Sequence, residues 1–268
     1  MDYPMILEPR SVATATESLS SYFPIPGYGV LPVNAFLIRA TQPVLIDTGL
    51  AALGEEFMQN LRSVIALNDL RWIWLTHTDP DHLGNLEAVL AEAPNARLVT
   101  TFLGMGKLIL NQLPVDRVYL LNPGQSLDVG DRQLVAVTPP CFDAPETTGL
   151  FDTRTQAFFS ADCFGALMNG PAKTAADIAP SDLRDGLITW ATVDAPWLHI
   201  VNEGEFDKAL DRVRGLKPSI ILSSHLPPAI GMTETLLGHL ATARTAPPFE
   251  GPDQAALAQM MAMAEQAA

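Results

Sequence analysis

Hydrophobic and polar positions along the first half of the chain alternate with two different periods, which predicts short strands mixed with helices. Apolar runs bounded by turn residues indicate strands, and apolar residues spaced three to four positions apart indicate helices. The predicted elements, in chain order, are strands at 34–39 and 43–47, a helix at 53–67, a strand at 70–76, a helix at 83–93, a strand at 98–101 and a helix at 102–113.

In the second half, short strand-like runs are separated by Gly, Pro and Asp. The predicted elements are strands at 117–121, 133–138, 149–152 and 155–160, a helix at 207–214, a strand at 220–223 and a helix at 232–243. Strands and helices therefore mix in both halves, which predicts an α/β (α+β) fold with sheets covered by helices on their outer faces.

No linker-like stretch divides residues 1–250, so we expect one large domain there. A Pro-rich stretch leads into residues 251–268, which we predict to be a helical tail. The apolar residues of this tail (Leu257, Met260, Met261 and Met263) are spaced for an amphipathic helix that packs on its own domain or on a second copy.

Composition narrows the class of protein. The 268 residues are 48% hydrophobic and 17% charged, which is typical of a globular chain rather than a disordered one. The net charge of −14 argues against nucleic acid or an anionic membrane as a partner. The start does not resemble a signal peptide, no apolar run is long enough to cross a membrane, and two cysteines make no disulfide framework. We therefore expect a cytoplasmic protein.

The strongest chemical signal is the segment 76–84, T-H-T-D-P-D-H-L-G, which holds His77, Asp79, Asp81 and His82 within six residues. It follows an apolar strand and precedes a predicted helix, so its side chains can converge on one point. Imidazole and carboxylate groups together suit Zn, Fe or Mn. A helix cap would need only one Asp, so the segment predicts a metal site.

Three further histidines lie outside this segment. His225 ends a strand-like run, at a position from which ligands often project, whereas His199 and His239 have no acidic neighbours in sequence and are predicted to be structural. Trp190 and Trp197 are expected to pack in the core, with the mouth of a pocket or a dimer contact as the alternative.

The segment resembles the metallo-β-lactamase superfamily signature, His-x-His-x-Asp-His. The resemblance extends over about 34–228: Asp47-Thr48-Gly49 resembles the end of the opening hairpin, and Phe159–Gly165 resembles the segment that supplies a bridging Asp, here Asp162. His225 matches the final histidine. The resemblance implies a four-layer αββα sandwich.

The second position of the signature indicates a branch of the superfamily. Hydrolases generally keep His there, whereas flavodiiron proteins and stand-alone oxygen-binding di-iron proteins carry Glu; this chain has Asp79. The spacing from His82 through Asp143 and Asp162 to His225 also resembles the di-iron branch. Phe142–Glu146 resembles the segment that presents a further histidine, which is replaced by Asp143.

The resemblance implies two metal ions. Site one would comprise His77, Asp79 and Asp143; site two would comprise Asp81, His82 and His225; Asp162 would bridge them. A carboxylate-rich set favours Fe, with Mn or Zn as alternatives, and the shorter Asp79 could leave site one weak or empty.

Three assignments stay open on the sequence. Asp143 is a ligand or a loop residue bonded to its own backbone, with Cys141 and Cys163 as alternative ligands. Asp47 either accepts a hydrogen bond from a ligating imidazole or closes a turn at its strand end.

Three functions are compatible with this set. The first is binding or reduction of O₂ or NO at a carboxylate-bridged di-iron centre. The second is hydrolysis of a lactone, ester or phosphoester by a metal-bound hydroxide, with Asp79 or Asp81 as the catalytic carboxylate. The third is a non-catalytic sensor on a drifted site. The sequence shows no phosphate loop, nucleophile elbow or flavodoxin-like segment. Electrons would then come from a separate donor, and a homodimer is the commonest assembly to expect.

Overall fold

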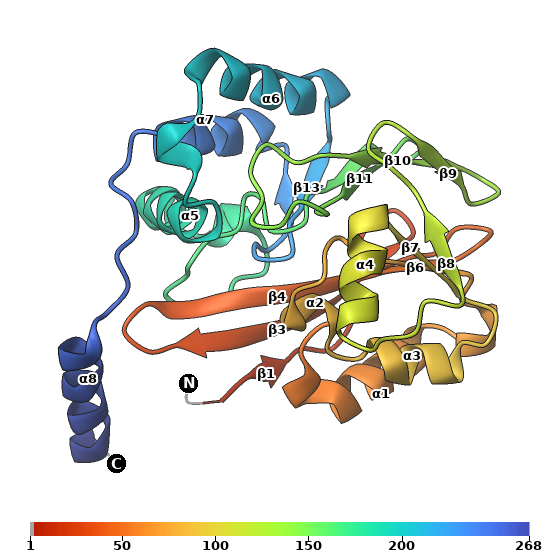
Figure 1. Cartoon of the computed structure of the whole chain (residues 1–268), viewed down its shortest axis with the longest axis horizontal. Coiled ribbons are helices and arrows are strands. Elements are labelled where there is room, and N and C mark those ends of the chain that lie inside the picture. The colour runs from red at the N-terminus through yellow and green to blue at the C-terminus, as the bar shows by residue number, and fades with distance from the viewer. Residues whose placement is uncertain (1–2, 268) are drawn as a thin grey trace.

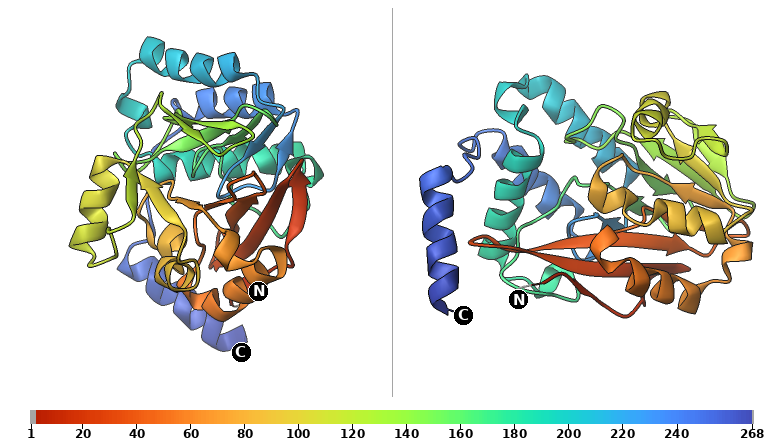
Figure 2. Two further views of the ribbon diagram at one scale, coloured as in Figure 1. Left: turned by 90° about the vertical axis from the view of Figure 1, so that its right-hand side faces the viewer. Right: turned by 60° about the horizontal axis from the view of Figure 1, so that its bottom comes forward.

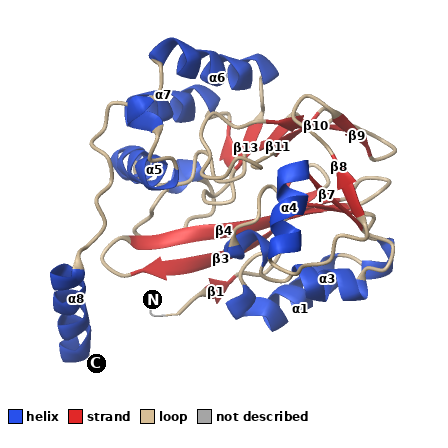
Figure 3. Cartoon of the chain, in the orientation of Figure 1, coloured by secondary structure: helices blue, strands red, loops and turns tan. Residues whose placement is uncertain are grey.

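The computed structural model describes residues 3–267, and side chains as far as Ala262. Two β-sheets lie face to face, and helices cover the outer face of each (Figures 1 and 3). The left view of Figure 2 shows these layers edge-on. The four-layer αββα arrangement expected from the sequence is therefore confirmed.

The first sheet contains the N-terminal strands. Its order is β1 (Met5–Ile6), β3 (Thr16–Ile25), β4 (Gly29–Ile38), β5 (Val44–Ile46), β6 (Trp72–Trp74), β7 (Arg97–Thr100) and β8 (Val118–Leu120), with β2 (Arg10–Ala13) paired to β3. Strands β5 to β8 run parallel, so their carboxyl ends lie at one edge of the sheet.

The second sheet is mainly antiparallel. Its order is β14 (Ala229–Ile230), β13 (Ile220–Leu222), β12 (Ala157–Phe159), β11 (Gly149–Asp152), β10 (Gln133–Val137) and β9 (Ser126–Asp128). Strands β12 and β13 are parallel neighbours, which places the residues that follow them side by side.

The helices form the two outer layers, and α8 stands apart from them. They are α1 (Gly54–Val64), α2 (Pro80–Leu83), α3 (Leu86–Glu92), α4 (Phe102–Leu110), α5 (Pro180–Asp194), α6 (Glu203–Leu216), α7 (Thr233–Ala243) and α8 (Gln254–Ala267). Short 3₁₀ turns lie at Ala51–Leu53, Leu67–Asp69, Ala175–Asp177 and Leu198–Ile200.

Alternation along the strands divides the apolar side chains among three core layers. On β4, Phe36 and Ile38 face the second sheet, and the ring of Phe36 packs edge-on against Phe159 with 5.4 Å between centroids. Leu37, between them, packs in the layer that contains α1 and α3. The opposite face of the second sheet, including Phe158, packs against α5, α6 and α7. Burial on both faces explains why these strands are apolar throughout.

Several predicted boundaries were wrong. The strand predicted at 34–39 begins five residues earlier, at Gly29, and the helix predicted at 83–93 is α3, which begins at Leu86 after the separate short helix α2. The helix at 207–214 extends over Glu203–Leu216 because Asn202 caps it through the backbone N–H of Glu205. Strands β1, β2, β3, β9 and β14 and helices α2 and α5 were not predicted.

The predicted tail helix is α8, at the tip of the β3–β4 hairpin (Figures 1 and 2). Leu257 and Met260 line an apolar hollow together with Tyr28 and Trp190 of the main body. The side chain of Met263 lies outside the described residues. Within residues 3–267, every helix is too short or too polar to cross a membrane.

Candidate metal centre

The candidate ligands follow the carboxyl ends of strands in both sheets. His77, Asp79, Asp81 and His82 come after β6, and Asp162 and His225 come after β12 and β13. Asp143 lies in the loop between β10 and β11. Parallel neighbouring strands end at the same edge of their sheet. Residues that are far apart in sequence therefore lie close together at the edge of the sandwich where these strands end.

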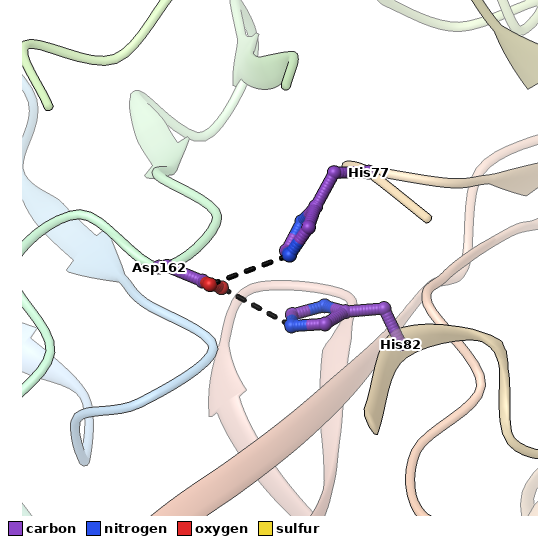
Figure 4. Close-up of side chains that lie close together, drawn as sticks. All are labelled: His77, His82 and Asp162. Carbon is purple, nitrogen blue, oxygen red and sulfur yellow. Dashed lines mark ion pairs between the residues drawn. The ribbon is translucent and has the colours of Figure 1, made fainter. Parts of the chain in front are cut away.

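Asp162 occupies the centre of this cluster (Figure 4). One oxygen, Oδ2, lies 3.3 Å from Nε2 of His77. The other, Oδ1, lies 3.1 Å from Nε2 of His82 and 3.2 Å from Nε2 of His225. A carboxylate with one oxygen toward His77 and the other toward the remaining two histidines has the geometry of a bridging ligand.

The remaining candidates fall into two groups around Asp162. His77, Asp79 and Asp143 each offer an atom within 4.8 Å of the others, and Asp81, His82 and His225 do the same. In the second group, Oδ2 of Asp81 lies 3.5 Å from Nε2 of His82 and 3.4 Å from Nε2 of His225. The structure thus brings together the residues that the resemblance assigned to site one and to site two.

Each histidine ring is oriented through its Nδ1 atom. Nδ1 of His82 lies 2.8 Å from Oδ2 of Asp47, and Nδ1 of His225 lies 2.7 Å from the carbonyl oxygen of Pro32. Nδ1 of His77 lies 3.1 Å from the hydroxyl of Thr76. With Nδ1 engaged, Nε2 is the nitrogen that faces the cluster, as in metal-binding histidines.

Asp47 does more than end its strand. Its Oδ1 accepts a hydrogen bond of 2.8 Å from the backbone N–H of Thr76, and its Oδ2 accepts one of 2.8 Å from the Thr76 hydroxyl. These contacts, together with His82, join β5 to the ligand loop. They fit the interpretation of Asp47 as a residue that orients an imidazole.

Several polar atoms at the centre are buried without hydrogen bonds. They are Nε2 of His77, Nε2 of His82 and Oδ1 of Asp162, whose close contacts with one another do not have the angles of hydrogen bonds. A buried polar atom without a partner costs about 1–3 kcal/mol. A cation bound between the imidazole nitrogens and the carboxylate would satisfy all three atoms, so the residues present fit a metal.

The charges inside the cluster depend on one another. Burial lowers the pKa of His225, but the carboxylates of Asp162 and Asp81 outweigh burial and raise it to about 9. Burial also lowers the pKa of His82, but the carboxylates of Asp162, Asp47 and Asp81 outweigh burial and raise this pKa well above its usual range. Burial raises the pKa of Asp162, yet the three histidines hold it well below its usual range. Without metal, protons on the imidazoles balance the carboxylates; a metal would replace those protons.

Site one is more open and more acidic. Asp143 is exposed and Asp79 is half-buried, whereas His77 is fully buried. Part of Asp143 is exposed, but the protein around its carboxyl group desolvates that group and raises its pKa to about 6; His77 opposes this shift, and the nearby Asp79 and Asp162 carboxylates add to it. Without a cation, Asp143 therefore keeps its proton up to about pH 6, well above the range of an ordinary Asp.

The loop that carries Asp143 is held by a residue the sequence analysis missed. Glu146 is 2% exposed; its Oε1 accepts a 2.6 Å hydrogen bond from Thr78 and lies 2.7 Å from Nζ of Lys107. This carboxylate ties the Asp143 loop to the ligand loop and to α4. The sequence shows only that Glu146 follows Asp143 by three positions in a segment with no helical pattern.

A second missed residue is Asp194, at the end of α5. It is 8% exposed, and it offers a carboxylate oxygen within 4.8 Å of those of Asp143 and Asp162. Burial raises its pKa well above the usual range, and Asp162 and Asp143 add to the shift. In the sequence Asp194 stands between Val193 and Ala195, without a neighbouring ligand residue that would mark it.

The two cysteines do not join either group of candidate ligands among the described residues. Sγ of Cys141 lies 3.4 Å from Sγ of Cys163, and both side chains are buried. The alternative that one of them replaces Asp143 therefore has no support from this geometry.

The tryptophans hold the loops of the site. Nε1 of Trp190 donates to the carbonyl of Asp162 at 3.2 Å, and its ring lies 4.7 Å from that of His225. Nε1 of Trp197 donates to the carbonyl of Phe142 at 2.9 Å. They are half-buried and support segments that carry candidate ligands.

Tight backbone conformations surround the cluster. Asp47 and Ala161 are non-glycine residues in the left-handed region, with φ of 57° and 52°. A Cβ on Gly84 would lie 2.3 Å from the carbonyl oxygen of Gly49, so only glycine permits the two loops to approach this closely. Strained positions persist where the surrounding structure fixes them, and they concentrate at functional sites.

Fold and geometry together define a β-lactamase-like sandwich with a candidate two-metal centre at the edge where its sheets open. The family model described as "ODP family beta lactamase" matches residues 31–225. The chain therefore belongs to the ODP family of β-lactamase-fold proteins, and the predicted membership of the metallo-β-lactamase superfamily is confirmed.

Curated relatives indicate the same branch. The anaerobic nitric oxide reductase flavorubredoxin of Pectobacterium atrosepticum is 31% identical over 134 residues, which cover 49% of this chain and 26% of that protein. The putative diflavin flavoprotein A 1 of Thermosynechococcus vestitus is 32% identical over 137 residues, 50% of this chain and 24% of that protein. The match thus spans about a quarter of the length of each relative.

Solved structures share the fold at lower identity. The flavodiiron protein from Giardia intestinalis has a TM-score of 0.77 at 17% identity, over 89% of this chain and 59% of that one. A fragment (1–254) of putative diflavin flavoprotein A 5 from Nostoc sp. PCC 7120 has a TM-score of 0.73 at 18% identity, over 91% and 96%. The expected resemblance to flavodiiron proteins is confirmed.

Proposed function

We propose that this chain reduces O₂ or NO at a di-iron centre bridged by Asp162. The observation that carries the proposal is the position of this carboxylate, with Oδ2 toward His77 and Oδ1 toward His82 and His225. Relatives named as a nitric oxide reductase and as a flavodiiron protein support the same activity.

The donor set supports iron. Site one would offer one imidazole nitrogen and the carboxylates of Asp79 and Asp143, and site two would offer two imidazoles and Asp81. Carboxylate-rich sets suit iron or manganese better than they suit thiophilic ions. Iron held there would supply the redox chemistry, while the chain fixes the ligands in place.

The protein itself contributes the orientation of the imidazole ligands and an apolar route to the site. Asp47, Thr76 and the carbonyl of Pro32 fix the imidazoles before any ligand arrives. An apolar hollow of about 390 Å³ reaches the site at Asp81 and is otherwise lined by Phe23, Leu31 and similar side chains. O₂ and NO are small and apolar, so an apolar approach admits them and disfavours charged substrates.

Protons and electrons must both be supplied. Reduction of two NO to N₂O and water consumes two protons and two electrons. Solvent would supply the protons at the open side of the cluster, where Asp143 is exposed and Asp79 and Asp81 are half-buried. We propose that a separate protein donates the electrons and that the working form is a cytoplasmic homodimer.

The test is anaerobic purification followed by elemental analysis and gas-consumption assays with a chemical reductant. We expect about two irons per chain and consumption of NO or O₂ by the reduced protein. Zinc or manganese together with hydrolysis of a lactone or ester would overturn the proposal in favour of a hydrolase. Absence of bound metal would favour a non-catalytic sensor.

A further inference from the structure

Asp194 is a buried carboxylate that the function above does not use. It ends α5, it is 8% exposed, and its Oδ2 has no hydrogen-bond partner. No ion pair offsets the cost of burying this carboxylate, because none of the Lys or Arg side chains among the described residues pairs with it.

The position at the helix end increases the cost of this burial. The carboxyl end of a helix carries a partial negative charge, which disfavours an acid and favours a cation. The last turn of α5 contains no basic residue. A buried carboxylate is normally paired or coordinates a metal, so Asp194 needs a positive partner.

The neighbours of the Asp194 carboxylate indicate that partner. Asp194 offers an oxygen within 4.8 Å of oxygens from Asp143 and Asp162. Asp143 also belongs to the group with His77 and Asp79, and Oδ2 of Asp162 faces His77. The Asp194 carboxylate therefore lies close both to Asp143, a candidate ligand of site one, and to the bridging Asp162.

We propose that Asp194 is a further ligand of the site-one metal. This inference rests on the proposed di-metal centre, and it concerns a residue from a helix in the opposite half of the fold. With Asp194, site one acquires a ligand that is more buried than Asp143 and Asp79. One competing explanation is a protonated Asp194 that donates a hydrogen bond to Asp162 or Asp143.

The Asp194→Asn variant separates these explanations, because an amide can donate a hydrogen bond but does not replace a carboxylate ligand. Asp185→Asn is the matched control: it removes one charge from an exposed, Arg184-paired residue of the same helix. The measurements are metals per chain, the rate of metal release to EDTA, and Tm of the metal-free and metal-loaded forms.

We expect Asp194→Asn to release one of its two metals about 10–100-fold faster than the wild type. In the metal-free form we expect its Tm to equal or exceed that of the wild type, because repulsion among buried acids is relieved. Asp194→Glu should restore part of the retention, and Asp185→Asn should change neither quantity.

Unchanged retention in Asp194→Asn would overturn the inference and leave the proposed function standing. A lower Tm in both forms, with no recovery in Asp194→Glu, would assign Asp194 a purely structural role and would also overturn it. A wild type that binds two metals without consuming NO or O₂ would overturn the function alone. A wild type that binds no metal would overturn both.

Discussion

Site one and site two differ in how completely the protein forms them before a metal arrives. Site two has two fully buried imidazoles, each held by an acceptor at Nδ1, with Asp81 beside them. Site one has one imidazole and acids that are half-buried or exposed. Site two is therefore preorganised, whereas the carboxylates of site one repel one another until a cation binds between them.

The largest effect should follow the loss of a site-two imidazole. In His82→Ala, site two loses a nitrogen ligand and Asp162 loses a partner of its Oδ1, so we expect metal affinity to fall more than about 100-fold, beyond the effect of an outer residue. Elemental analysis after dialysis measures this. His199→Ala, at an exposed histidine away from the cluster, is the control. Full retention by His82→Ala would refute the assignment of site two.

The second effect concerns the metal-free protein at alkaline pH. His225 has a pKa raised to about 9, against about 6.5 in an unfolded chain. A raised histidine pKa stabilises the fold fully below pH 6.5, and this stabilisation is lost as the pH rises through 9. The loss is about 3 kcal/mol from this residue alone. The raised pKa of Asp143, about 6 against the ordinary 3.8, also makes the fold less stable as the pH rises, but between these two lower pH values.

Denaturant unfolding of EDTA-treated protein at pH 6.5 and pH 9.5 measures this loss. The metal-loaded protein should resist it, because the metal takes the place of the proton on Nε2 and its binding strengthens as the pH rises. Equal stability of the metal-free protein at both pH values would mean that the imidazoles are not charged by the surrounding carboxylates.

The third effect tests why site two is preorganised. Asp47→Asn keeps the shape of the side chain and tolerates the left-handed backbone at this position. It removes the negative charge opposite Nδ1 of His82, so site two should lose about 10–100-fold in metal affinity. Asp128→Asn, on the exposed edge of the second sheet, is the control. An unchanged metal affinity would mean that Asp47 only joins β5 to the ligand loop and does not tune His82.

The same contrast explains what could be predicted from sequence. Four candidate ligands lie within six residues after a buried strand, so local spacing alone indicated them. Asp194 could not be found in this way, because it reaches the cluster only through the packing of α5, and α5 itself was missed. Its run Leu187–Asp194 mixes Trp, Thr and Val with few strong helix formers.

The missed β3 and the late start predicted for β4 have a similar origin. Pro24 and Pro32 lie within these strands, and proline within an apolar run lowers the expectation of a strand. Ser18 and Ser21 of β3 are buried, which hides the alternation of polar and apolar positions. The carbonyl of Pro32 then orients His225, a role that no side-chain pattern encodes.

The smallest expected effect comes from making site one resemble site two. Asp143→His replaces an exposed carboxylate with an imidazole and relieves the repulsion among Asp79, Asp143 and Asp162. A second nitrogen ligand suits zinc better than the original acid does. We expect zinc retention at site one to rise about tenfold relative to iron, with site two unchanged. Competition between the two metals, followed by elemental analysis, measures the ratio; an unchanged ratio would mean that Asp143 does not contact the metal and that Asp79, Asp194 and His77 complete site one without it.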